Sequence, residues 1–194
     1  MVPVTTRVLT RDPRGYHVVE VLDAFAPVDA RERAHHARML ALLATTDAPF
    51  MRDQFDPGHF TASALVISRD AGKVLLIHHP TLSLWLQPGG HVELGDATLV
   101  AAARREVREE TGLEATIAPA CFDLDIHEIP ARGAAPAHLH HDIRFLAIVD
   151  GLPTPASAER VEARWLTPRQ AATLTTDESV RRMVRKAFPD MPNA

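Results

Sequence analysis

The feature that most constrains this chain is a glycine-rich loop, residues 88–96, that leads directly into a helix with three glutamates near its end. Ala and Leu residues favour a helix from about residue 99 onward, and Gly112 is the expected left-handed stop. Asp96 or Thr98 is the expected N-cap, because a short side-chain oxygen there accepts from free backbone N–H groups. The segment therefore predicts a loop–helix unit over residues 89–113.

The glutamates of this helix predict a cation site. At about 100° per residue, Glu106, Glu109 and Glu110 share one side of the helix. Like charges four residues apart repel by about 0.2–0.5 kcal/mol, and anions in the last turn oppose the helix dipole by roughly 0.3–1 kcal/mol. Arg105 can reach Glu109, but one guanidinium does not neutralise three acids. A bound divalent cation would, and oxygen ligands of this kind suit Mg²⁺ or Mn²⁺.

A solvated acidic helix face is the simpler alternative for these glutamates, and it is the commoner one in proteins generally. The loop at Pro88, Gly89 and Gly90 favours a site, because glycines allow a ligand to approach the backbone closely. The helix start that follows the loop is also a natural anion site.

The same stretch resembles the signature of the Nudix hydrolases: Gly, five residues, Glu, seven residues, then Arg-Glu-apolar-any-Glu-Glu-any-Gly-apolar. Gly90 is the first glycine, and residues 105–113 match the second half throughout. The chain departs at Asp96, which stands where the family has Glu, and eight residues instead of seven separate it from Arg105. The extra residue lengthens the loop or the first helical turn. The flanking pattern extends the resemblance to about residues 60–187.

The resemblance implies an α/β fold, the Nudix-type α/β/α sandwich with a mixed central sheet. It implies hydrolysis of a diphosphate bond in a nucleotide or nucleoside-diphosphate derivative, by attack of water. The catalytic residues would be Glu106, Arg105 and Glu109, with Arg105 orienting a signature glutamate through a charge-assisted bond. The ligands of Mg²⁺ or Mn²⁺ would be Glu106, Glu109, Glu110 and the Gly90 carbonyl.

The general base is left open by the sequence. In related enzymes it is a signature glutamate or a residue from a distant loop, and it must lie within reach of the attacking water. Glu106 is the first choice. The candidates outside the signature are His140, His141, Glu159 and Glu162.

The chain is expected to divide into an N-terminal helical appendage, residues 1–58, and a Nudix hydrolase domain, residues 59–190. Asp29 to Glu32 has the spacing of a capping box, ahead of a helix that reaches about Thr45. This appendage packs on the main domain or on a second subunit, or else it covers the substrate site. His35 and His36, in the middle of its helix, are expected to be solvated.

Strands are predicted at 61–68, 73–78, 113–117, 120–129, 138–149 and 161–166, with helices from 167 and over 179–188. This order predicts a mixed sheet between helices. Trp85, just before the glycine loop, is either a core or rim aromatic or a platform on which a base stacks. The predicted substrate-binding residues are Gly89, Gly90, Trp85, His140 and His141.

A histidine cluster marks the strand at 138–149. Alternation puts His138, His140 and Asp142 on one side and His141 on the other. Three interpretations are open: a zinc site, because neutral imidazoles are good ligands; contacts to substrate or proton transfer beside the metal site; and a structural cluster. Further residues that could join it are His127, Asp123 and Asp125.

The composition of the chain limits the classes of molecule that it is expected to bind. The net charge is −4 and no basic run occurs, which argues against a dedicated binder of nucleic acid or of an anionic membrane. Cys121 is the sole cysteine, so no internal disulfide forms and a reducing compartment, the cytoplasm, is expected. No segment approaches the length needed to span a bilayer. The expected partner is a small nucleotide-type substrate, and a homodimer is common in the family.

Two other functions remain as alternatives. One is a catalytically weak Nudix-fold sensor or regulator that binds nucleotides, although the intact glutamate set argues against it. The other is the isomerase branch of the fold, which acts on isoprenoid diphosphates and needs a well-placed cysteine. Cys121 is the single thiol and is expected in a strand core, which disfavours the isomerase.

Overall fold

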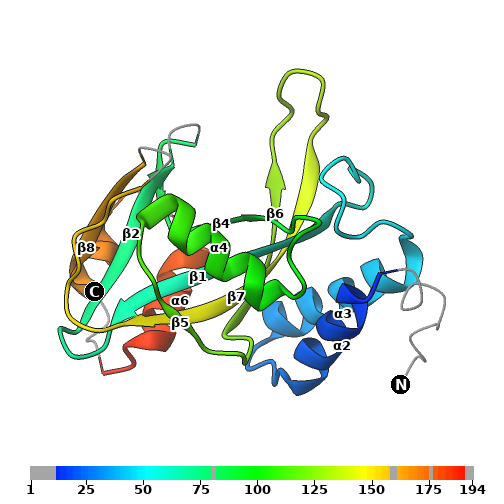
Figure 1. Ribbon diagram of the computed structural model, residues 1–194. Coiled ribbons are helices and arrows are strands. Elements are labelled where there is room, and N and C mark those ends of the chain that lie inside the picture. Colours follow the sequence, from blue (N-terminus) through cyan, green and yellow to red (C-terminus); the bar gives the residue numbers. More distant parts are fainter. Residues whose placement is uncertain (1–11, 80–81, 158–160, 175–176, 191–194) are drawn as a thin grey trace. The chain divides into compact units, whose positions relative to one another are not determined.

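The computed structural model describes residues 12–79, 82–157, 161–174 and 177–190 (Figure 1). The chain forms two compact units. The first contains the described residues up to Ala62 together with 90–102 and 120–144, and the second contains 63–89, 103–119 and the residues from Phe145 onward. The predicted division into residues 1–58 and 59–190 stays a prediction.

Two helices open the first unit, α2 (Arg14–Ala24) and α3 (Ala30–Thr45). Asp29 caps α3, because its carboxylate accepts from the backbone N–H of Glu32 at 2.8 Å. The Glu32 carboxylate accepts in turn from the backbone N–H of Val28, also at 2.8 Å. The predicted capping spacing therefore forms, with the return bond shifted by one residue.

The two histidines of α3, which were expected to be solvated, are only partly exposed and also bond backbone carbonyl oxygens. His35 Nδ1 donates to the carbonyl oxygen of Leu124 at 3.1 Å, and His36 Nε2 donates to that of Leu22 at 2.9 Å. Both rings are half-buried. They tie α3 to β6 and to α2, which are too far away in sequence for helix periodicity to reveal as partners.

The strands belong to one sheet of eight. They are β1 (His59–Ser68), β2 (Lys73–His79), β3 (Leu84–Leu86), β4 (Gly89–His91), β5 (Thr116–Ile117), β6 (Asp123–Ile129), β7 (His138–Val149) and β8 (Glu162–Leu166). The order is β3-β2-β1-β7-β5, with β4 beside β1, β6 beside β7 and β8 beside β2. All residues of β1 are buried, as expected for a central strand.

In the second unit the predicted hairpin of β1 and β2 is present, with Val66 opposite Leu75 and an antiparallel register. Strand β8 pairs with β2 along five positions, from Val74–Leu166 to His78–Glu162. Helices α5 (Pro168–Thr173) and α6 (Glu178–Ala187) follow. Thr167 starts α5 with a capping box, which confirms the predicted helix start.

The strands around Cys121 are shorter than predicted. Strand β5 has two residues, and β6 begins at Asp123. Cys121 therefore precedes β6, where it is half-buried and its thiol donates to the carbonyl oxygen of Asp123 at 3.3 Å. The expectation of a cysteine in a strand core was wrong.

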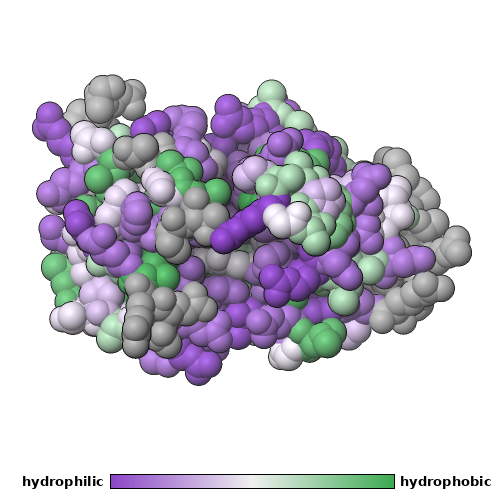
Figure 2. All heavy atoms as spheres, turned by 90° about the horizontal axis from the view of Figure 1, so that it is seen from above, coloured by the Kyte–Doolittle hydropathy of each residue, from purple (hydrophilic) through white to green (hydrophobic). Residues whose placement is uncertain are grey.

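Hydrophilic side chains cover much of the face shown in Figure 2, and hydrophobic ones gather only in small groups. The large apolar side chains that are exposed come from different parts of the chain: Tyr16, Val28, Met51, Leu94 and Leu152. Among the described residues, no helix has both the length and the apolar character needed to cross a membrane.

Candidate active site

The start of α4 (Leu99–Thr111) is capped by Thr98, whose hydroxyl accepts from the backbone N–H of Ala101 at 3.1 Å. Asp96 is not the cap. Its buried carboxylate accepts from the backbone N–H of Glu93 at 2.8 Å and closes the turn before the helix. Asp96 therefore lies in the loop that precedes α4.

Gly112 ends α4 as predicted. Its φ is +71°, in the left-handed region, and its N–H donates to the carbonyl oxygen of Arg108 at 2.8 Å. A Cβ atom at this position would overlap the backbone carbonyl of Ala156. Glycine is therefore required here both by conformation and by space.

Arg105 bridges two of the three glutamates. Its Nη1 donates to Glu106 Oε1 at 2.8 Å and to Glu109 Oε2 at 2.9 Å. The Arg105 and Glu106 side chains are mostly buried, at 16% and 13% exposure, whereas Glu109 is 38% exposed. The predicted contact from Arg105 to Glu109 is present, and the same guanidinium also holds Glu106.

Glu110 is held by the glycine loop. Its Oε2 accepts from the backbone N–H of Gly89 at 2.9 Å, and the residue is buried. Gly90 follows Gly89 in the short strand β4. The structure thus brings the last glutamate of the signature to its glycine loop, 21 residues earlier in the chain.

Trp85 lies in the middle of β3 and is largely buried. The guanidinium carbon of Arg164 lies 4.9 Å from the centre of its ring, and the His78 ring is 5.4 Å away. Among the candidate bases, Glu162 is exposed on β8 and accepts from Arg164 at 2.8 Å. Glu159 lies outside the described residues.

His140 lies in a group of histidine rings within the first unit. Its ring centre is 4.7 Å from that of His59 and 5.1 Å from that of His91. His138 and His127 lie at 5.2 and 5.6 Å. Burial, with a smaller contribution from the neighbouring rings, lowers the pKa of His140 to about 2. Burial also lowers the pKa of His59, so both rings are neutral at pH 7.

His141 points to the other side of β7, as the alternation predicts. It is buried against Phe60, with ring centres 6.1 Å apart, and its Nε2 donates to the carbonyl oxygen of Pro57 at 3.3 Å. Burial lowers the pKa of His141 to about 4, although the bond to Pro57 opposes the shift.

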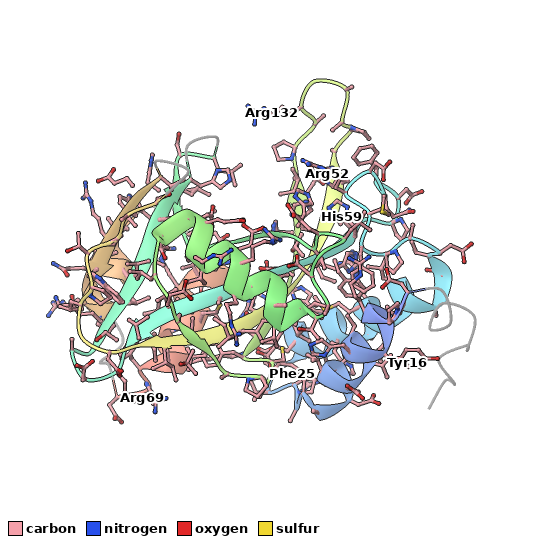
Figure 3. All side chains as sticks on the ribbon, viewed as in Figure 1. Tyr16, Phe25, Arg52, His59, Arg69 and Arg132 are labelled. Carbon is pink, nitrogen blue, oxygen red and sulfur yellow. The ribbon has the colours of Figure 1, made fainter. Side chains whose placement is uncertain are left out.

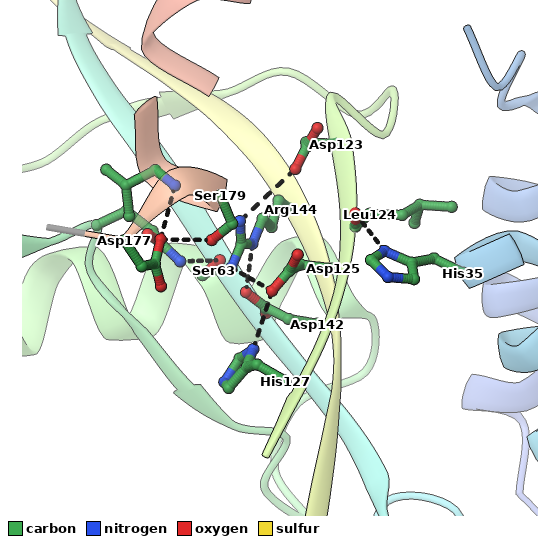
Figure 4. A network of polar contacts seen from close by, with 12 residues as sticks. His35, Ser63, Asp123, Leu124, Asp125, His127, Asp142, Arg144, Asp177 and Ser179 are labelled. Atoms are coloured by element: carbon green, nitrogen blue, oxygen red, sulfur yellow. Dashed lines mark hydrogen bonds and ion pairs between the residues drawn. The ribbon is translucent and has the colours of Figure 1, made fainter. Parts of the chain in front are cut away.

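The Asp142 carboxylate faces Arg144 (Figure 4). Its Oδ2 accepts from Arg144 Nε at 2.8 Å, and its Oδ1 accepts from the Thr61 hydroxyl at 3.1 Å. Asp125 and Asp123 also face Arg144, at 3.2 and 3.6 Å. Burial acts to lower the pKa of Arg144, but the three carboxylates outweigh it and raise the pKa. The three acids therefore form a buried ion network around Arg144, and Asp125 also contacts His127 of the histidine group at 3.2 Å.

Two members of the histidine group were not among the predicted site residues. His59 is the first residue of β1, and His91 is the last residue of β4. Neither position carries a local signal beyond the residue type. Their approach to His140 depends on β4 and β7 both lying beside β1, which the sequence does not encode locally.

Comparison with known proteins identifies the family. The family model of the NUDIX domain matches residues 58–187 of this chain. The chain belongs to the Nudix family. The predicted resemblance is confirmed, whereas the roles of the individual site residues stay predictions.

Three relatives illustrate the Nudix relationship. A probable DHNTP pyrophosphohydrolase of Lactococcus lactis subsp. cremoris (strain MG1363) is 36% identical over 99 residues, which are 50% of this chain and 58% of that protein. The chain thus matches little more than half of that relative's length. The E. coli dihydroneopterin triphosphate pyrophosphohydrolase superposes with a TM-score of 0.59 at 22% identity, covering 68% of this chain and 96% of the other. A C. elegans Ap4A hydrolase gives 0.54 at 21% identity, covering 67% and 95%. The likeness confirms the predicted α/β/α sandwich fold.

Proposed function

We propose that this Nudix protein is a pyrophosphohydrolase that uses Mg²⁺ or Mn²⁺ to hydrolyse a diphosphate bond in a small nucleotide-type substrate. The observation that carries the proposal is the arrangement on α4, where three carboxylates accompany one guanidinium and the third carboxylate is held by the glycine loop. In this family, that combination of loop and acidic helix is the expected site of phosphate chemistry.

The donor set fits such an ion. Carboxylate oxygens are the ligands that hard divalent cations prefer, and Glu106, Glu109 and Glu110 supply them from two successive helical turns. Arg105 balances at most one of their charges. Under this proposal, the three glutamates and the Gly90 carbonyl would hold the cation. When bound, the ion neutralises phosphoryl oxygens and lowers the pKa of water.

Residues of the chain would then accept the proton, position the glutamates and admit the phosphate. Glu106 is our choice for accepting the proton of the attacking water, because it belongs to the signature and its side chain is mostly shielded from solvent. Arg105 would position Glu106 and Glu109, since one of its nitrogens contacts both. Gly89 would fix Glu110 by its backbone N–H. The loop glycines would admit a phosphate close to the backbone.

The substrate class is tested with a panel of diphosphates in the presence of Mg²⁺ or Mn²⁺. The names of the first two relatives place dihydroneopterin triphosphate in that panel, and the name of the third adds diadenosine tetraphosphate. ADP-ribose, sugar nucleotides and nucleoside triphosphates, including oxidised ones, complete it. We expect water to cleave a diphosphate bond of at least one member into two phosphate-containing products, and the cleavage to stop when the metal is chelated.

The outcomes separate the competing functions. Tight binding of one member without hydrolysis would replace the enzyme by the sensor or regulator. Hydrolysis that survives chelation would remove Mg²⁺ and Mn²⁺ from the proposal. Light scattering of the purified chain tests whether it forms the homodimer common in the family. The cytoplasm remains the proposed location, since Cys121 cannot form an internal disulfide.

A further inference from the structure

Three histidines from three separate strands meet in the first unit: His59 of β1, His91 of β4 and His140 of β7. Each can offer one ring nitrogen, and these nitrogens all lie within 4.8 Å of one another. The ring centres are 4.7–5.1 Å apart. Figure 3 labels His59 where β1 begins, next to the hairpin formed by β6 and β7.

The hydrogen bonds of His59 prepare it as a ligand. Its Nδ1 donates to the carbonyl oxygen of Gln54 at 3.1 Å, so the proton is on Nδ1 and the lone pair is on Nε2. That Nε2 is buried and has no hydrogen-bond partner among the described residues, and the whole residue is 0% exposed. A backbone carbonyl that accepts from the second ring nitrogen is the usual support of a metal-bound histidine.

His140 shows the same feature as His59. Its Nε2 is also buried without a hydrogen-bond partner in the described part of the chain. Buried polar atoms in proteins are nearly always paired, so two orphaned nitrogens on adjoining rings require an explanation. A ligand seated between the rings would satisfy both.

The chemistry of the three rings determines which ligand they suit. The buried Nε2 atoms of His59 and His140 have no hydrogen-bond partner among the described residues, so their lone pairs can be directed at a cation. Uncharged imidazole nitrogens suit zinc and neighbouring transition metals, whereas Mg²⁺ prefers oxygen. Of the acids near the group, Asp125 contacts His127 and Arg144.

We propose that His59, His91 and His140 bind one divalent transition metal of the zinc class, in a three-histidine site with a fourth position open to water. Zinc–nitrogen bonds of about 2.0–2.1 Å require the three rings to close around the ion by small side-chain rotations. His91 is half-buried, which gives the ion a route from solvent. This nitrogen site is separate in composition from the oxygen ligands of α4.

The test uses the full chain with any affinity tag removed, stripped with a chelator and titrated with Co²⁺ and with Zn²⁺. With excess Mg²⁺ present to fill the carboxylate site of α4, we expect a visible ligand-field absorption band that saturates at one Co²⁺ per chain and that Zn²⁺ displaces. H59Q and H91Q should weaken Zn²⁺ binding by at least about 100-fold, because losing even an outer support of a ligand costs about 10–100-fold. H91Q tests the loss of a ligand with less disturbance of the fold than H59Q, because the His91 side chain is only half-buried.

Two controls distinguish this site from its alternatives. H36Q removes a histidine of α3 that bonds Leu22 and lies outside the cluster, so it should keep the Co²⁺ band. E110Q removes a carboxylate of the proposed Mg²⁺ site and should keep the band as well. Loss of the band in E110Q, an unchanged band in folded H59Q and H91Q, or no Co²⁺ binding by the unmutated chain would each overturn the proposal, whatever the outcome for diphosphate hydrolysis.

Discussion

The backbone N–H of Gly89 donates to the Glu110 carboxylate at 2.9 Å, which joins the loop before the signature to the last glutamate within it. The donor is a backbone group of Gly89, and the backbone of Glu110 is held in the last turn of α4. The bond therefore sets the position of a carboxylate that would otherwise have several rotamers.

The change Glu110→Gln tests what this carboxylate contributes. Glutamine keeps an oxygen that can accept from Gly89, but it removes the charge. We expect kcat/KM for the hydrolysed substrate to fall by at least about 100-fold, as when one charge-stabilising group is removed from a transition state. The free energy of unfolding should change by less than about 1 kcal/mol. Steady-state kinetics and chemical denaturation measure the two.

The matched control is Glu114→Gln, the same change at an exposed position just after α4. It should leave kcat/KM within about twofold of the original. Equal effects of the two substitutions would mean that net charge, and not a site, is responsible.

Arg105→Gln tests whether Arg105 positions the catalytic glutamates or binds the substrate. Without the guanidinium that contacts Glu106 and Glu109, these carboxylates lose a shared anchor. We expect kcat to fall by about 10–100-fold with KM nearly constant, because small displacements of catalytic groups lower the rate steeply. Arg105→Lys should recover part of kcat. Arg104→Gln, at an exposed position of the same helix, should be silent. A rise in KM alone would assign Arg105 to the substrate instead.

The signature helix could be predicted from the sequence because its determinants are local. Thr98 caps it, Gly112 ends it, and the contact from Arg105 to Glu109 follows from helical spacing. Interactions that depend on strand pairing could not be predicted in this way. His59 and His91 approach His140 only because two different strands lie beside β1.

In β7, the alternation of side chains predicts the side on which Asp142 lies, but it does not predict which residue Asp142 contacts. Alternation placed Asp142 on the same side as His140, but Arg144 shares that side two residues later and takes the Asp142 carboxylate. The long reach of a guanidinium decided the outcome. Nothing in the spacing reveals that Arg144 would be 1% exposed and would gather three acids.

The buried network predicts a large stability loss for Arg144→Met. Removing the cation leaves Asp123, Asp125 and Asp142 buried together, and breaking such an ion network costs about 3–5 kcal/mol. Arg164→Met is the control, because its pair with Glu162 is more than half exposed and contributes about 0–1 kcal/mol. Urea denaturation at pH 7 compares them. A loss below about 1 kcal/mol for Arg144→Met would show that the acids become protonated or hydrated at little cost.

Gly112→Ala tests the end of the signature helix. The left-handed backbone costs a side chain about 1–2 kcal/mol, and overlap with the Ala156 carbonyl adds about 1–3 kcal/mol. Gly72→Ala is matched to it, because Gly72 also has a positive φ, +59°, but a Cβ there has open space. We expect thermal denaturation to show the larger loss for Gly112→Ala. Equal losses would mean that the Ala156 segment moves away freely.

His141 contributes to the pH dependence of stability. Its pKa falls from the usual 6.5 to about 4 on folding, chiefly through burial. The unfolded chain therefore binds more protons between these pH values, so this contribution to stability is complete above pH 6.5 and is lost as the pH falls toward 4. At pH 5 the loss is about 2 kcal/mol for this one group. His141→Gln should make the free energy of unfolding less dependent on pH between 7 and 5 than it is in the unmutated chain. If His141→Gln kept the slope of the unmutated chain, protonation of His141 in the folded state would have to be tolerated, with its ring turned away from Phe60 and toward water.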